Sequence, residues 1–117
     1  MDKREKQNKR SIIAAVLDLA GARLKDSEVN TLFNIVSTPE NYDGKTRTIE
    51  KSFTSWCSDG KYRRKESTTY TILADDSGLR IEEDYAYHDD DGQWGGSKVI
   101  HTSARAILRL LSSIFGL

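Results

Sequence analysis

Three turn sequences that are rich in aspartate and end in glycine divide the second half of the chain into segments of strand length. They are Asp59-Gly60, Asp75-Asp76-Ser77-Gly78 and Asp89-Asp90-Asp91-Gly92. Aspartate followed by glycine is a strong signal for a tight hairpin, because glycine adopts the positive φ angles that such turns require. The segments between the turns are rich in β-branched and aromatic residues, as strands are. We therefore expect an antiparallel meander with strands over about 45–57, 61–74, 79–88 and 93–101, in the order 1-2-3-4.

The turns also predict how the strands pair. The expected partners are Cys57 with Tyr62, Trp56 with Arg63, Ile72 with Ile81, and Tyr87 with Trp94. In this register apolar side chains collect on one face, as a half-buried sheet requires. That face holds Ile49, Phe53, Cys57, Tyr62, Tyr70, Ile72, Leu79, Ile81, Tyr85 and Tyr87. The opposite face is expected to be open and holds Thr48, Glu50, Thr54, Trp56, Arg63, Lys65, Thr69, Thr71, Leu73, Arg80, Glu82, Asp84 and Val99.

Helices are expected on both sides of the meander in the sequence. Apolar residues recur at helical spacing and predict helices over about 3–24, 27–37 and 103–115. The expected fold is an α+β two-layer sandwich, formed by one domain over residues 1–117. In it, two N-terminal helices and one C-terminal helix cover one face of the four-stranded sheet.

The composition excludes several classes of protein. Eighteen basic residues balance eighteen acidic ones, so no strong overall attraction to nucleic acid or to an anionic membrane is expected. A single cysteine, Cys57, cannot form an internal disulfide. The apolar stretch after the charged N-terminus is too short for a signal peptide or a membrane span. We expect a cytoplasmic protein that does not bind membranes.

No arrangement of residues predicts catalysis or a cofactor. The two histidines, His88 and His101, are expected on the open face near opposite ends of the sheet, too far apart to share a metal ion. Cys57 has no histidine expected beside it, which a nucleophilic cysteine needs. If Gly92 is placed at the glycine position of an EF-hand loop, Lys98 stands where the bidentate glutamate belongs. We expect a protein that is not an enzyme and has no metal or other cofactor.

The open face has the composition of a protein interface, because an exposed tryptophan beside arginines is typical of interaction hot spots. The leading interpretation is a non-enzymatic protein-binding module, with the site residues Trp56, Arg63, Lys65, Thr54, Leu73 and Arg80. Its size and the lack of catalytic residues suit a small inhibitor or adaptor, such as a phage- or plasmid-borne inhibitor of host defence. The exposed sheet edges, the first strand above all, are also able to accept a strand from a partner or to form a homodimer.

Nucleic-acid binding is the alternative interpretation. Cations that contact phosphates, together with aromatic side chains that stack on bases, are its usual signature. The residues concerned are Lys61, Arg63, Arg64 and Lys65 of the first hairpin, with Lys3, Arg4, Lys6, Lys9 and Arg10 of the first helix. The competing expectation is that the acidic third strand neutralises the hairpin, since the register places Arg64 opposite Asp89 and Arg63 opposite Asp90.

Overall fold

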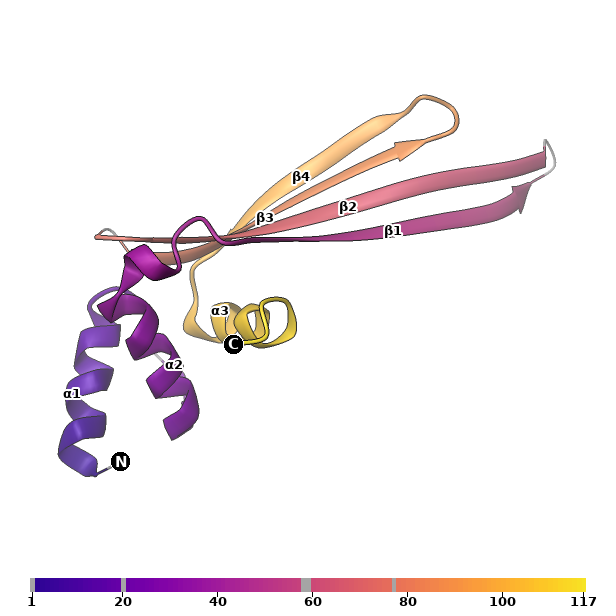
Figure 1. The fold of residues 1–117 in the computed structure, drawn as a ribbon. Coiled ribbons are helices and arrows are strands. Elements are labelled where there is room, and N and C mark those ends of the chain that lie inside the picture. Colours follow the sequence, from indigo (N-terminus) through magenta and orange to yellow (C-terminus); the bar gives the residue numbers. More distant parts are fainter. Residues whose placement is uncertain (1, 20, 58–59, 77) are drawn as a thin grey trace.

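The computed structural model describes residues 2–19, 21–57, 60–76 and 78–117. It contains the helices α1 (Lys3–Ala14), α2 (Asp26–Ser37) and α3 (Ala104–Ser113) and the short 3₁₀ helix η1 (Pro39–Asn41). The strands β1 (Thr46–Cys57), β2 (Gly60–Asp75), β3 (Gly78–Asp89) and β4 (Trp94–His101) form one antiparallel sheet in the order β1-β2-β3-β4 (Figure 1). The expected α+β class and meander are confirmed.

The first helix is shorter than its apolar spacing predicts. It begins where the Asp2 carboxylate accepts a hydrogen bond from the N–H of Glu5, and it ends at Ala14 instead of near residue 24. The N–H groups of the next two residues bond to carbonyls only three positions back, which closes the helix. Asp18 then forms an isolated bridge with Ser103, the residue that caps α3. A tertiary contact therefore replaces the last turns that the pattern predicts.

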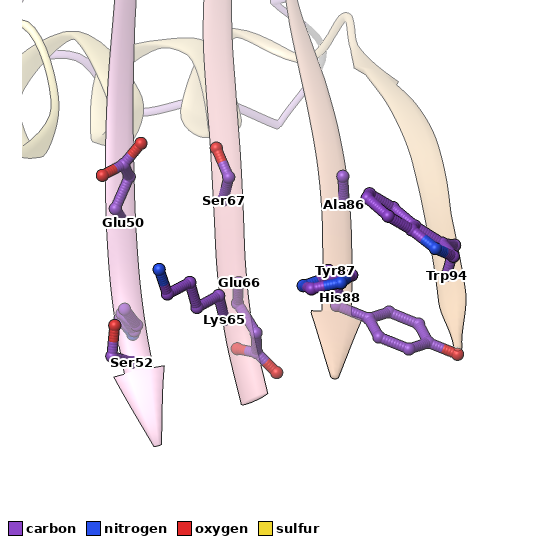
Figure 2. Close-up of a pocket in the computed structure, with 10 residues that line it drawn as sticks. Glu50, Ser52, Lys65, Glu66, Ser67, Ala86, Tyr87, His88 and Trp94 are labelled. Carbon is purple, nitrogen blue, oxygen red and sulfur yellow. The ribbon is translucent and has the colours of Figure 1, made fainter. Parts of the chain in front are cut away.

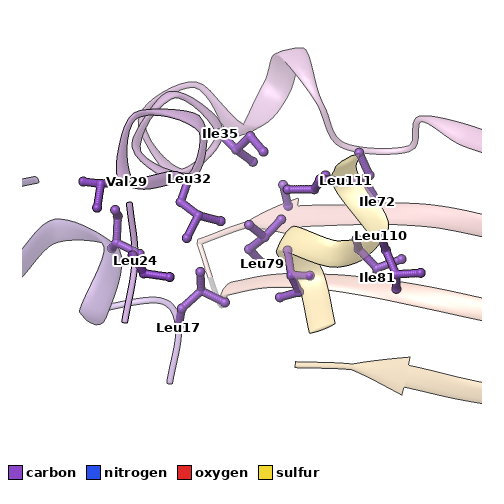
Figure 3. Close-up of a cluster of buried hydrophobic side chains, with 13 residues drawn as sticks. Leu17, Leu24, Val29, Leu32, Ile35, Ile72, Leu79, Ile81, Leu110 and Leu111 are labelled. Atoms are coloured by element: carbon purple, nitrogen blue, oxygen red, sulfur yellow. The ribbon is translucent and has the colours of Figure 1, made fainter. Parts of the chain in front are cut away.

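One hydrophobic core joins the helices to the end of the sheet next to the β2–β3 turn (Figure 3). Ile72 and Ile81, which lie opposite each other in β2 and β3, are completely buried. The other buried apolar residues are Ile13, Leu17, Leu24, Val29, Leu32, Ile35, Ala74, Leu79, Ala104, Ile107, Leu110 and Leu111. All three helices lie on one side of the sheet, so the opposite face is open (Figure 1).

The sheet extends far beyond the helices that cover it (Figure 1). The 16 residues of β2 span about 53 Å at the usual strand rise, whereas the ten residues of α3 span only about 15 Å. The molecule therefore measures 66 × 24 × 22 Å. We call the part that projects beyond the helices, formed by residues 48–57, 60–69 and 84–98, the arm. Over its length both faces of the sheet are exposed to solvent.

The central pairing follows the prediction, but the first hairpin is displaced. Ile72 pairs with Ile81 as expected. In the first hairpin Cys57 pairs with Gly60 and Trp56 pairs with Lys61, so the predicted register is wrong by two residues. The last pair of this ladder is Cys57 with Gly60, and the expected turn residue Asp59, like Ser58, lies outside the described residues. Because the side-chain period of a strand is two, this shift leaves every β1 side chain on its predicted face.

The pairing of β4 differs by one residue, which exchanges its two faces. His88 pairs with Trp94, whereas the prediction paired Tyr87 with Trp94. The connection is a three-residue turn: the N–H of Asp89 donates to the carbonyl of Gln93 at 3.2 Å, and Gly92 has a φ of 79°. The expectation of Val99 and His101 on the open face is therefore wrong. Both lie on the helix side, and Trp94, Lys98 and Ile100 lie on the open face.

Candidate interaction surface

The arm exposes large apolar side chains on both of its faces. Trp56 is 79% exposed and Trp94 is 75% exposed, and both lie on the open face. Phe53 and Ile49 lie on the opposite face, where they continue the row of core side chains past the end of the helices. Every residue of β1 from 46 to 56 is exposed. Since exposed tryptophans and phenylalanines are uncommon on a free surface, the arm is the leading candidate for the functional site.

Three cations alternate along β2 on the open face of the arm, at Lys61, Arg63 and Lys65. Their neighbours in β1 are Trp56, Thr54 and Ser52. The expected positions opposite β3 are confirmed, because Arg64 lies opposite Asp89 and the N–H of Asp90 donates to the carbonyl of Arg63. The expected pair of Trp56 with Arg63 is wrong, since Trp56 lies opposite Lys61. The expected neutralisation does not follow, since none of the ion pairs among the described residues includes these three cations.

A shallow hollow of about 390 Å³ lies on the open face in the middle of the arm. On one side the rings of His88 and Trp94 are in contact, with their centroids 4.2 Å apart and their planes inclined at 48°. On the other side the ammonium end of Lys65 extends from β2 toward β1, and Glu50 lies at the end nearer the helices (Figure 2). Small side chains, such as Ser52 and Ala86, form the floor. The hollow therefore combines an aromatic wall with charges of both signs.

The other face of the arm carries a hydrogen-bonded network. Arg64 donates to the hydroxyl of Tyr85 at 2.9 Å, and that hydroxyl donates to Glu66 at 2.8 Å. The Nε of Arg64 lies 3.1 Å from Glu66 without the alignment of a hydrogen bond, and the guanidinium lies over the ring of Tyr87 at 4.1 Å. Arg64 therefore points away from Arg63 and Lys65 and is not part of their surface.

Asp89 holds the turn at the outer end of β3. Its carboxylate accepts hydrogen bonds from the hydroxyl of Tyr62 and from the N–H groups of Asp91 and Gln93. Burial by itself raises the pKa of the Asp89 carboxyl, but the three hydrogen bonds outweigh it and lower that pKa below its ordinary value. Burial and the hydrogen bond to Asp89 raise the pKa of Tyr62. Asp89 is thus a structural anion, and it lies on the opposite face of the sheet from Lys61, Arg63 and Lys65.

The remaining predicted site residues lie away from the arm. Leu73 and Arg80 lie opposite each other near the β2–β3 turn, about 27 Å along the strand from Lys65. Arg80 contacts Asp75 there at 3.4 Å. They share the open face with Trp56, Thr54, Arg63 and Lys65, but the structure does not bring the six residues together.

The cations of α1 lie at the opposite end of the molecule from the tip of the first hairpin (Figure 1). Lys6 pairs with Asp26 at 2.9 Å, and this contact lowers the pKa of Asp26. Lys9 pairs with Glu5 and lies over the ring of Phe33. Lys3, Arg4 and Arg10 have no such partner among the described residues. The helix and the hairpin therefore do not form one basic surface.

The two histidines occupy opposite faces of the sheet. His88 contacts the ring of Trp94, and His101 lies 3.3 Å from Glu83 on the helix side. Within the described ranges no cluster of three histidine, cysteine or carboxylate side chains is placed to hold a metal ion. Nor is any described helix long and apolar enough to cross a membrane.

Sequence reasoning missed Trp94 as a member of the surface, because the one-residue error in β4 placed it on the other face. It also missed the arm itself. The signal was present in the expected strand lengths, since strands of more than twelve residues are much longer than the helices that were expected to cover them.

Comparisons of the chain with protein-family models, with curated proteins and with solved structures give no match. The fold and the surface described above are therefore the basis for the function.

Proposed function

We propose that this chain is a non-enzymatic protein-binding module and that the open face of the arm is its recognition surface. The observation that carries the proposal is the exposure of Trp56 and Trp94 on a part of the sheet that no helix covers. Tryptophan buries a large area with little loss of side-chain freedom, and it is enriched among residues that dominate binding energy. Arg63, on the same face, adds a second residue type of this kind.

The charges of the surface favour a protein over a polyanion. Carboxylates lie on both sides of the row formed by Lys61, Arg63 and Lys65. Glu50 is on β1 on one side, and Asp90 is beside Arg63 on the other. The whole chain has no net charge and a pI of about 6.7. Domains that bind nucleic acid usually present a continuous surface of one sign. A mosaic of both signs instead selects one complementary protein surface.

The shape suits a protein that acts by occupying a surface of its partner. The helical end holds the fold together, and the arm projects the recognition residues away from it (Figure 1). Inhibitors and adaptors work in this way, without a catalytic centre. An inhibitor of host defence that is carried by a phage or plasmid is one role of this class.

Affinity capture with matched variants tests the proposal. The wild-type chain, Trp56→Ala, Trp94→Ala and Ile12→Ala are immobilised and exposed to the same lysate. Ile12 is a suitable control because it too is a large exposed apolar residue, and it lies on α1, away from the arm. The wild type and Ile12→Ala should retain the same partner, and each tryptophan variant should retain less than about a tenth of it. Equal capture by all four folded proteins would exclude the open face as the recognition surface.

Nucleic-acid binding is the second candidate, favoured by three cations that form no ion pair among the described residues, beside the exposed rings of His88 and Trp94. Fluorescence anisotropy with labelled single-stranded and duplex DNA and RNA at two salt concentrations tests it. If the candidate is correct, replacing Arg63 and Lys65 by alanine should weaken binding and reduce the salt slope by about two. No binding by the wild type at low salt would rule the candidate out.

A further inference from the structure

We propose that the outer edge of β1 binds its partner by strand addition, and that the added strand alternates acidic with apolar residues. This inference rests on the proposed function, because it specifies how the partner of the arm is held. It concerns the edge of β1, whereas the proposal above concerns the open face.

The hydrogen-bond pattern shows which backbone groups of β1 are available. The N–H of Ile72 donates to the carbonyl of Lys45 at 2.9 Å, so the carbonyl of residue 45, just before β1, points toward β2. Antiparallel ladders alternate, so the odd-numbered residues of β1 bond to β2 and the even-numbered residues point outward. The N–H and C=O groups of residues 46, 48, 50, 52, 54 and 56 therefore line a free edge, since β1 is the terminal strand of the sheet.

Of the features that normally prevent strand addition, this edge has only charged side chains, at Arg47, Glu50 and Lys51. Natural edge strands are short, interrupted by a bulge or proline, or covered by another element. β1 has 12 residues and no proline, and all 12 pair with β2 in one unbroken register. Its residues from 46 to 56 are exposed, and the helices lie beside only its first residues (Figure 1). A long, regular and uncovered edge is suited to pairing with another strand.

The two faces beside this edge define the chemistry of the added strand. On the open face the β1 residues Ser52 and Thr54 are small. The ammonium end of Lys65 extends from β2 toward β1 near Ser52 (Figure 2). Carboxylates on an added strand would meet Lys65 and Arg63 there. On the other face Ile49 and Phe53 are 39% and 49% exposed and flank Lys51. Apolar side chains there would cover them and the aliphatic stem of Lys51. Beside residues 51–55, beyond the carboxylate of Glu50, alternation of glutamate and valine suits both faces because successive side chains of a strand point to opposite sides.

The test uses a blocked, fluorescent peptide of eight residues that alternates valine with glutamate, with a valine–lysine peptide for comparison. The outward N–H of Ser52 is not part of the β2 ladder, so Ser52→Pro removes an edge donor and leaves the hairpin bonds intact. Ser52→Ala is the matched control. We expect wild type and Ser52→Ala to bind the valine–glutamate peptide, more weakly at high salt. Ser52→Pro and the valine–lysine peptide should each reduce affinity at least tenfold.

A second measurement does not depend on the folding of a variant. Peptides methylated on every valine nitrogen or on every glutamate nitrogen each lose one hydrogen-bonding edge. The wild-type protein should bind one of them and reject the other. Equal binding of both, or no binding of the unmethylated peptide, would overturn strand addition while leaving the capture result with Trp56→Ala unaffected. A dimer of the wild type that Ser52→Pro converts to a monomer would identify a second copy as the occupant and overturn the acidic partner.

Discussion

At the scale of single residues, Asp89 shows how a buried charge is kept in this small domain. It is 4% exposed, yet its carboxylate has three hydrogen-bond donors at 2.9–3.0 Å. Two of the donors are backbone N–H groups of the turn that follows β3, and the third is the hydroxyl of Tyr62 on β2. The sequence shows an acidic turn at this place. It does not show which of the three aspartates turns inward.

Asp89 should make the stability of the protein depend on pH in the acid range. Its folded-state pKa lies below the ordinary value of about 4 that applies to the unfolded chain. The stabilisation is therefore present above about pH 4 and is lost as the pH falls through the lower folded-state pKa. Urea unfolding between pH 2.5 and 7 should show a smaller acid loss for Asp89→Asn than for the wild type. Asp90→Asn, at an exposed position of the same turn, should keep the wild-type profile.

At the scale of elements, the sheet has a covered part and an uncovered part that share one apolar face. Ile72 in β2 is completely buried against the helices, and Phe53 lies on the same face of β1 in the arm. Only Ile72 is surrounded by other side chains on all sides. The energetic value of an apolar side chain in this sheet therefore depends on its distance along the strand from the helices.

Alanine substitutions at Ile72 and Phe53 should distinguish the covered part of the sheet from the uncovered part by their effect on stability. Ile72→Ala should lower the free energy of unfolding by about 2–5 kcal/mol, because it leaves a cavity in the core. Phe53→Ala should lower it by less than about 1 kcal/mol, since much of its ring is already in water. Urea titrations of the isolated protein measure both. A cost for Phe53→Ala as large as that for Ile72→Ala would mean that the arm is covered in solution, for example by another copy.

The elements could be predicted well from the sequence, and their connections less well. The predicted β2–β3 pairing was correct because the apolar residues on the two sides of this turn, Ile72 and Ala74 before it and Leu79 and Ile81 after it, must lie opposite each other. The β3–β4 pairing was wrong because Asp89-Asp90-Asp91-Gly92 fits a four-residue or a three-residue turn equally well by composition. The inward carboxylate of Asp89 decides between them. Local patterns identify turns, whereas their exact length depends on contacts made across strands.

At the scale of the whole molecule, the protein is much more extended than a typical domain of its size. Its radius of gyration is 18.5 Å, compared with about 13 Å for a compact chain of this length. The extension is due to the arm. Of the candidate site, Trp56, Arg63, Lys65 and Thr54 could be placed on one face from the sequence. Trp94 could not, and the isolation of Leu73 and Arg80 from them follows only from the length of the strands.

The three-residue turn between β3 and β4 limits how the chain can change during evolution. Insertion or deletion of one residue in it would exchange the faces of all eight residues of β4. Val99 and His101 would leave the helix side, and Lys98 and Ile100 would take their places. A single codon gained or lost here would thus alter the protein as much as eight simultaneous substitutions, whereas a change of two codons would preserve both faces. Lengths of this turn in descendants of the chain should differ by even numbers of residues.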